Sequence, residues 1–204
     1  MIARFTWAVN AVFRKFVYRN FVRHPEVNDY ETNTNVGHGF GLARTIDPLT
    51  QILRVIRYMG IARMPFSRNF SIIDLGCGDG FMLKGFDFVG FKNLTGIELD
   101  KELAFLAAEN VIRAKIHCVD FSSPDFSDTL GRSSYAAVFA FNPAPANKLI
   151  YALKSIAEGG SFVLFLRNPK FWTEVSLEQD LCFEILGKPS NMVVARVSSA
   201  TPSK

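Results

Sequence analysis

The residues with the clearest chemical potential are acids and glycines between positions 74 and 120. The segment Asp74-Leu75-Gly76-Cys77-Gly78-Asp79-Gly80 follows a short apolar run and precedes a stretch of helical character. Glycines in such a turn let the backbone bend sharply, and they let a ligand approach where a Cβ atom would otherwise stand. The segment therefore predicts a strand, a ligand-binding turn and a helix, in that order.

An acid also ends each of the next two apolar runs. Glu98 lies roughly 20 residues past the turn, where a carboxylate commonly accepts hydrogen bonds from ribose hydroxyls. Asp120 ends the following run and is suited to accept from an exocyclic amine, while Leu99 or Phe121 could cover the ring of a base. Each acid taken singly could instead cap a helix or face solvent. Together they indicate a nucleoside ligand.

The glycine spacing distinguishes two kinds of nucleotide site. The dinucleotide fingerprint Gly-x-Gly-x-x-Gly needs a third glycine where this chain has Phe81, a large side chain at a point of close helix packing. A pyrophosphate would also face the like charges of Asp74 and Asp79, whereas a cation would be attracted to them. An NAD-dependent oxidoreductase is therefore the less favoured alternative.

The elements that must position these residues alternate along the chain. Short apolar runs predict strands at 71–75, 94–97, 116–119, 136–141 and 161–166, and helical patterns lie between them at 81–88, 101–110 and 146–157. The polar stretch 122–134 has no assigned element. Alternation of this kind predicts a parallel sheet with helices on both faces. The runs 183–186 and 192–197, separated by a turn, predict a closing antiparallel hairpin.

In their order these motifs resemble the class I S-adenosylmethionine-dependent methyltransferase family over about residues 71–197. The resemblance implies an α/β, Rossmann-like, doubly wound seven-stranded sheet, mostly parallel, with a C-terminal antiparallel hairpin and S-adenosylmethionine as cofactor. It implies that Asp74 and the glycine turn hold the methionyl part, Glu98 the ribose hydroxyls and Asp120 the adenine amine. The expected cofactor contacts are Asp74, Gly76, Cys77, Gly78, Asp79, Gly80, Glu98, Leu99, Asp120 and Phe121.

Family members carry substrate-facing groups after the fourth strand. Asn142 and Pro143 match the start of the Asp/Asn/Ser-Pro-Pro-aromatic pattern of amine-methylating members, whereas Ala144 and Pro145 depart from it. The same residues are also typical of a strand end followed by a helix start. An oxygen or ammonium acceptor must lose a proton, and His38 lies in a polar loop that could fold over the site. We expect Asn142, Pro143 and His38 to act at the acceptor.

Three segments organise the chain. Residues 1–23 carry five basic and no acidic residues around an apolar stripe, which predicts an amphipathic helix that packs on protein or lies in an anionic membrane surface. Residues 24–70 predict a polar loop and a helix that cover the cofactor site, and residues 71–204 the methyltransferase domain. N-terminal helices are therefore expected in addition to the sheet.

The composition excludes several classes of protein. A chain of 204 residues with 49% hydrophobic residues can bury one core, and no apolar run approaches the roughly 20 residues of a membrane span. Three cysteines without C-x-x-C spacing indicate neither disulfides nor a metal site, and they favour a cytoplasmic protein, peripheral to a membrane if residues 1–23 bind one. The net charge of +4, without clustered Lys or Arg, gives no strong nucleic-acid signal.

The sequence thus favours a methyltransferase whose acceptor is a small molecule, a sugar or a protein side chain. Two alternatives stay open. One is a catalytically silent methyltransferase fold that serves as a partner subunit, and the other is the NAD-dependent oxidoreductase.

Overall fold

The computed structural model describes residues 60, 64, 67–130, 133–141, 145–167, 169–188 and 192–200, all within the compact unit Arg54–Lys204. The predicted N-terminal helices and the predicted site residues His38, Asn142 and Pro143 lie outside the described residues. The described elements are β1 (Ser71–Leu75), α3 (Phe81–Val89), β2 (Asn93–Glu98), α4 (Lys101–Asn110), β3 (Lys115–Cys118), α5 (Pro124–Leu130), β4 (Ala137–Ala140), α6 (Ala146–Ala157), β5 (Phe162–Arg167), α7 (Pro169–Val175), β6 (Leu181–Gly187) and β7 (Met192–Ser199).

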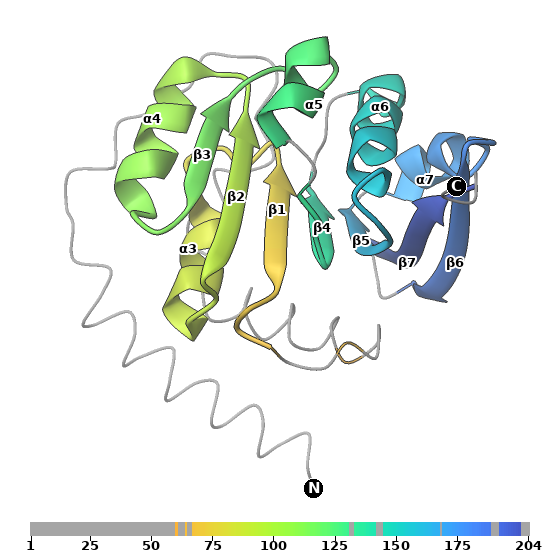
Figure 1. The fold of residues 1–204 in the computed structure, drawn as a ribbon, viewed down its shortest axis with the longest axis horizontal. Coiled ribbons are helices and arrows are strands. Elements are labelled where there is room, and N and C mark those ends of the chain that lie inside the picture. The colour runs from red at the N-terminus through yellow and green to blue at the C-terminus, as the bar shows by residue number, and fades with distance from the viewer. Residues whose placement is uncertain are drawn as a thin grey trace, which may run out of the picture. The chain divides into compact units, whose positions relative to one another are not determined.

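The strands of this part of the chain form a seven-stranded sheet in the order β3-β2-β1-β4-β5-β7-β6. Strands β1 to β5 are parallel, while β7 is antiparallel to both β5 and β6 (Figure 1). The chain builds outward from β1 in one direction through β2 and β3, and then in the other direction from β4. Ligands of such sheets bind outside the carboxyl ends of the strands where this reversal occurs. The order of the strands therefore places a candidate site at the carboxyl ends of β1, β2 and β4.

The four inner parallel strands β1, β2, β4 and β5 are largely buried on both faces, which explains their nearly unbroken apolar runs, whereas the edge strand β3 has no buried residue. In β4, Val138 and Ala140 pack with residues of α5, α6 and α7, whereas Ala137 and Phe139 pack with residues of α3 and α4. Phe139 stacks on Phe165 of β5 with ring centroids 4.6 Å apart and ring planes 5° apart. Aromatic pairs of this kind add about 1 kcal/mol beyond the burial of their surface. Phenylalanine thus serves here as core filling on the α3 side of the sheet.

The predicted elements are confirmed where the sequence pattern is regular. Helices α4 and α6 have the predicted bounds, and each of the five parallel strands agrees with its prediction to within one residue at either end. The hairpin of β6 and β7 is also confirmed. Two helices were missed: α5 lies inside the unassigned stretch 122–134, and α7 was not predicted.

Both missed helices have seven residues and depend on the core. Helices this short are marginal in isolation, because few hydrogen bonds repay the cost of nucleation. Phe126 and Leu130 of α5 are buried, as are Trp172 and Val175 of α7. Their spacings of four and three residues place each pair on one helix face. Burial of that face, rather than local propensity, therefore accounts for the two helices.

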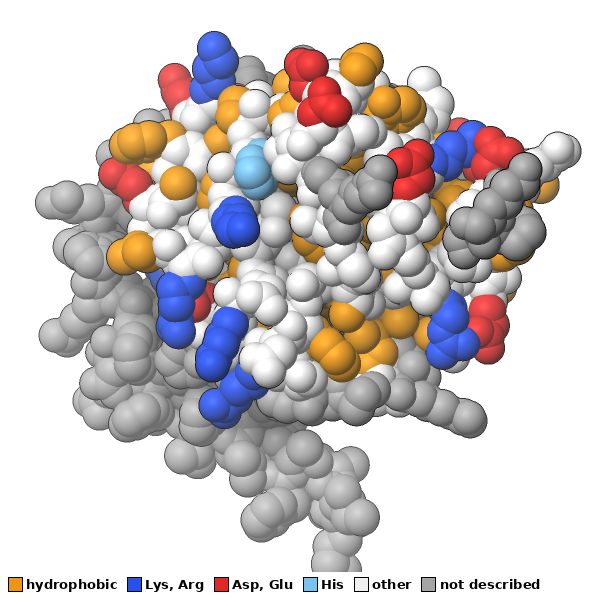
Figure 2. Space-filling model, in the orientation of Figure 1, with side chains coloured by type: hydrophobic (Ala, Val, Ile, Leu, Met, Phe, Trp, Pro, Cys, Tyr) orange, Lys and Arg blue, Asp and Glu red, His pale blue; other side chains and the backbone are white. Residues whose placement is uncertain are grey.

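The face of the described residues that Figure 2 presents carries side chains of several kinds. Figure 2 shows basic, acidic and hydrophobic side chains interspersed on the face it presents, rather than a field of one sign. In the part of the chain that the structure describes, no helix combines the length and the apolar character that crossing a membrane requires.

Candidate functional site

The glycine turn that follows β1 is fixed by backbone hydrogen bonds to β2. The N–H groups of Gly76 and Cys77 both donate to the carbonyl of Ile97, over 2.8 and 3.0 Å. Gly76 and Gly78 have φ angles of +76° and +57°, in the left-handed region that favours glycine. A Cβ atom built on either residue would meet no atom within 4 Å. The turn thus presents open space above two positions that carry no side chain.

Gly80 has a different task from the first two glycines of the turn. A Cβ atom there would lie 3.1 Å from both the Cα of Ala107 and the Cγ2 of Val111. Its lack of a side chain lets the start of α3 pack closely on the end of α4. The dinucleotide fingerprint requires this close packing at position 81, but in this protein it occurs at Gly80, and Phe81 is only half-buried as the first residue of α3.

Glu98, at the end of β2, holds the turn from the carboxyl-terminal edge of the parallel strands. Its Oε2 accepts a hydrogen bond from the N–H of Gly78 over 2.8 Å, and its Oε1 accepts from the N–H groups of Leu99 and Asp100 over 2.8 and 3.0 Å. A carboxylate has about four acceptor positions, so these three bonds leave room for a hydroxyl hydrogen. Glu98 is therefore oriented before any ligand arrives.

Asp74 is the buried acid of the site, with only 2% of its surface exposed near the end of β1. Burial raises its pKa, and the neighbouring charge of Glu98 raises it further, to about 7. Asp79 continues the acidic character into the turn. Its carbonyl accepts from the side-chain amide of Asn110 over 2.9 Å, which joins the turn to the end of α4. This end of the site is thus acidic and rigidly supported.

Asp120 follows β3 and is held by three hydrogen bonds. Its Oδ1 accepts from the N–H of Ser122 over 2.9 Å and from the Ser122 hydroxyl over 2.7 Å, while its Oδ2 pairs with the ammonium of Lys148 over 2.7 Å. Hydrogen bonds from Lys148 and then Ser122 lower the pKa of Asp120 to about 2. The carboxylate therefore stays ionised at neutral pH. Glu98 of β2 pairs with Cys118 of β3 in the sheet register. Asp120 follows Cys118 by two residues and therefore lies at the same edge of the sheet as Glu98.

The remaining predicted cofactor contacts differ in exposure. The side chain of Leu99 is 63% exposed beside Glu98, so it is free to cover a bound ring. Phe121 is only 8% exposed and packs edge-on to Phe126, with ring centroids 6.4 Å apart. The thiol of Cys77 packs in the core on the α3 side, and burial raises its pKa. Phe121 and Cys77 therefore support the site from the core.

The structure adds three residues that sequence reasoning missed, namely Asn110, Ser122 and Lys148. Ser122 could have been found locally, since a serine two residues after an aspartate commonly donates to it in a turn. Asn110 and Lys148 lie 31 and 28 residues from their partners, and no pattern in the sequence joins them. Among the described residues, no group of three or more His, Cys, Asp and Glu side chains is arranged to hold a metal ion.

Several solved structures share this fold. One is a ribosomal protein L11 methylase from Lactobacillus delbrueckii subsp. bulgaricus, at 13% identity and a TM-score of 0.52, with 74% of this chain and 78% of that chain covered. A second is an S-adenosylmethionine-dependent methyltransferase from Anabaena variabilis, at 13% identity and a TM-score of 0.52, with 71% and 83% covered. A third is the methyltransferase domain of bacterial CtHen1-C, at 14% identity and a TM-score of 0.50, with 76% and 100% covered.

At the level of sequence alone, no protein-family model and no curated protein matches this chain. At identities of only 13–14%, the TM-scores of 0.50–0.52 to the solved structures show a shared arrangement of strands and helices. The strand order, the parallel strands and the closing hairpin agree with that result. The chain therefore has the class I S-adenosylmethionine-dependent methyltransferase fold.

Proposed function

We propose that this protein is an S-adenosylmethionine-dependent methyltransferase whose acceptor is a small molecule, a sugar or a protein side chain. The observation that carries the proposal is the hydrogen bond from the Gly78 N–H to Glu98, 2.8 Å long. This bond joins a glycine turn with open space above it to an acid at the end of the next strand. The same edge of the sheet carries Asp120 after β3. A turn and acids in this order suit an adenosine-bearing ligand.

The charges of the site fit a cationic cofactor. Asp74 and Glu98 lie close enough for the charge of one to raise the pKa of the other, so a bound cation would relieve their repulsion. S-adenosylmethionine supplies an electrophilic methyl group on a positively charged sulfur. A dinucleotide pyrophosphate at the same place would add to the repulsion. The charge balance therefore favours the sulfonium ligand over NAD.

The residues of the turn and of the end of β2 have distinct roles in this binding. Gly76 and Gly78 leave the approach to the turn open, and Asp74 offers negative charge to the methionyl end of the ligand. Glu98 accepts from the ribose, and Leu99 covers the base. Because methyl transfer is an in-line displacement, alignment of donor and acceptor supplies much of the acceleration. The rigid turn contributes that alignment from the cofactor side.

The acceptor belongs, in this proposal, at the end of β4. Phe141 is half-buried there and packs edge-on to Phe139, with ring centroids 5.8 Å apart. The next residues, Asn142 and Pro143, are proposed to contact the acceptor, and His38 is proposed to take its proton. These three residues lie outside the described part of the chain, so their roles are carried by the sequence pattern alone.

A binding experiment tests the cofactor assignment. Isothermal calorimetry of the full chain with S-adenosylmethionine, S-adenosylhomocysteine and NAD should show binding of the first two only. In Gly78→Val the new side chain occupies the open space above the turn, and we expect affinity for S-adenosylhomocysteine to fall by about 100-fold or more. Gly90→Val is the matched control, because Gly90 also has a positive φ but ends α3 away from the turn.

The outcomes separate the competing functions. Binding of NAD in place of S-adenosylmethionine would refute the methyltransferase and favour the oxidoreductase. Unchanged affinity in Gly78→Val, with a cooperative thermal transition, would refute the placement of the ligand. Transfer of labelled methyl groups from S-adenosylmethionine to a fraction of cell extract then distinguishes an enzyme from a silent partner subunit, which would bind the cofactor and transfer nothing.

A further inference from the structure

We propose that Lys148 is a positioning residue for recognition of the adenine amine, because it fixes the Asp120 carboxylate with one acceptor position left for an N–H donor. This inference rests on the function proposed above. It concerns a residue on α6, far in sequence from the three acids, and it makes the selectivity of the site for a 6-amino purine depend on an ion pair within the protein.

The geometry of Asp120 carries the inference. Ser122 uses both acceptor positions of Oδ1, through its N–H and its hydroxyl. The ammonium of Lys148 uses one position of Oδ2 over 2.7 Å. With about four positions on a carboxylate, one remains, and it belongs to Oδ2. A group that donates one hydrogen fits that position, whereas a group with only lone pairs is repelled by the charge.

Lys148 does more in this arrangement than neutralise charge. Ser122 is a near neighbour of Asp120 in the chain and fixes only Oδ1, so the carboxylate could still tilt about that anchor. Lys148 approaches Oδ2 from α6, which packs on the core through Leu149 and Leu153. Ser122 and Lys148, which come from two separate parts of the chain, therefore fix the orientation of the Asp120 carboxylate. The unused acceptor position on Oδ2 is fixed with it.

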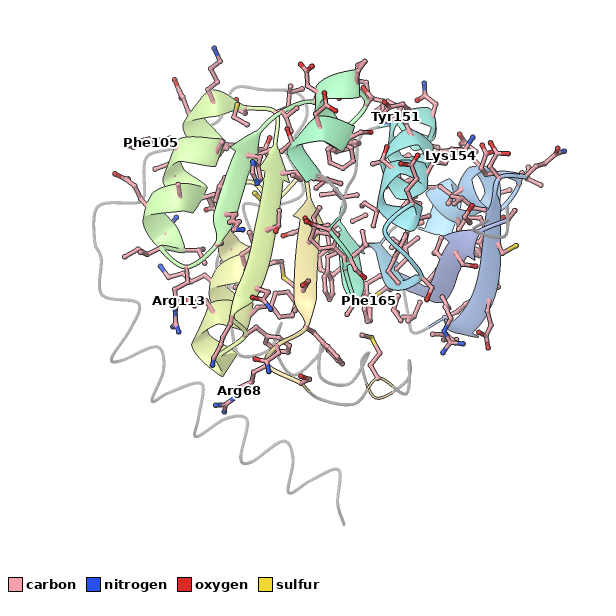
Figure 3. All side chains as sticks on the ribbon, in the orientation of Figure 1. Arg68, Phe105, Arg113, Tyr151, Lys154 and Phe165 are labelled. Atoms are coloured by element: carbon pink, nitrogen blue, oxygen red, sulfur yellow. The ribbon has the colours of Figure 1, made fainter. Side chains whose placement is uncertain are left out.

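A second lysine on the same helix supplies an internal comparison. Lys154 is 36% exposed, as Lys148 is, and it also forms ion pairs, over 2.9 Å with Glu178 and 2.7 Å with Asp180. Its partners precede β6, and Figure 3 shows Lys154 on the side of α6 that faces the C-terminal elements. Substitution of Lys154 thus removes surface ion pairs comparable to that of Lys148 but leaves the hydrogen bonds of Asp120 intact.

The test compares two ligands that differ only at position 6 of the purine. Calorimetry measures the dissociation constants of S-adenosylhomocysteine and of its analogue with hydrogen in place of the 6-amino group. The ratio of the two constants reports the amine contact. In the wild type we expect a ratio of about 10 or more, since a hydrogen bond to a charged group is usually worth that much. In Lys148→Met the ratio should fall at least about threefold.

Three variants sharpen the result. Lys148→Arg keeps a donor within reach of Oδ2 and should restore most of the wild-type ratio, whereas Lys154→Met should leave the ratio unchanged. Asp120→Ala removes the acceptor and should bring the ratio close to 1. Thermal unfolding of each variant checks that the fold persists.

Two results would overturn the proposal. An unchanged ratio in Lys148→Met means that Lys148 forms only a surface ion pair. Equal weakening of both ligands means that it supports the fold without orienting the amine contact. A wild type that binds neither ligand refutes the proposed cofactor itself, and that result is distinct from the other two because it needs no variant.

Discussion

The two ends of the candidate site hold their carboxylates in opposite ways. At the turn end Asp74 is buried, and the charge that acts on it is the like charge of Glu98, so its pKa rises to about 7. At the β3 end Asp120 is about one-third exposed and paired with Lys148, so its pKa falls to about 2. The fold has supplied a counter-charge at one end only. A bound cation would therefore be stabilised most at the turn end, where the acids have no counter-charge among the described residues.

The largest expected effect of this difference is on stability at the turn end. In the unfolded chain Asp74 ionises near its ordinary pKa of 3.8, while in the folded protein it keeps its proton until about pH 7. Because Asp74 is ionised only in the unfolded state over this pH range, the free energy of unfolding falls as pH rises. Relative to Asp74→Asn, the wild-type free energy of unfolding should fall by on the order of a few kcal/mol between about pH 4 and pH 7.

Chemical denaturation at several pH values measures this quantity for both proteins. Asp128→Asn, an exposed aspartate on α5, serves as control and should keep the wild-type profile. A difference between wild type and Asp74→Asn that stays constant from pH 4 to pH 7 would contradict the assignment of a raised pKa to Asp74.

The next effect is on the binding of the proposed cationic cofactor. Below pH 7 the proton on Asp74 must leave before the carboxylate can face a cation. Affinity for S-adenosylmethionine should therefore rise with pH and level off near pH 7, by up to about tenfold per pH unit. Titrations between about pH 5.5 and 7.5 measure the slope, which Asp74→Asn should remove. A wild-type affinity that does not change over this range would show that Asp74 does not meet the cation.

The smallest effect belongs to Asp120 at the β3 end and has the opposite sign. Because the folded pKa of Asp120 lies below the ordinary 3.8, its contribution to stability is complete above about pH 4 and is lost as pH falls toward 2. Solvent screens this partly exposed pair, so the loss should stay below about 1 kcal/mol. Acid unfolding of Asp120→Asn beside the wild type measures it. A loss larger than about 1 kcal/mol over this acid range would contradict the prediction and indicate that the pair of Lys148 and Asp120 stabilises the fold more than its exposure suggests.

Much of the fold could be predicted because its signals are local. The run Ile72-Ile73, the glycines that follow and the acid at position 98 lie within short windows, and each has a backbone or side-chain requirement that few residues satisfy. The spacing of apolar residues and the lengths of the apolar runs likewise predicted α4, α6 and the strands. The seven-residue helices α5 and α7 were not predicted, because their stability comes from burial of Phe126 and Trp172 in a core built by distant strands.

The sequence by itself determined which acids and glycines end consecutive strands of the sheet, because parallel strands with short crossovers bring those ends to one edge. Only the tertiary structure decided how each acid is used. It set Glu98 against the Gly78 N–H, gave Asp120 a lysine from α6, and left Asp74 buried beside a like charge. The physical reason is that desolvation and ion pairing depend on neighbours brought together across the fold, which no local pattern of residues records.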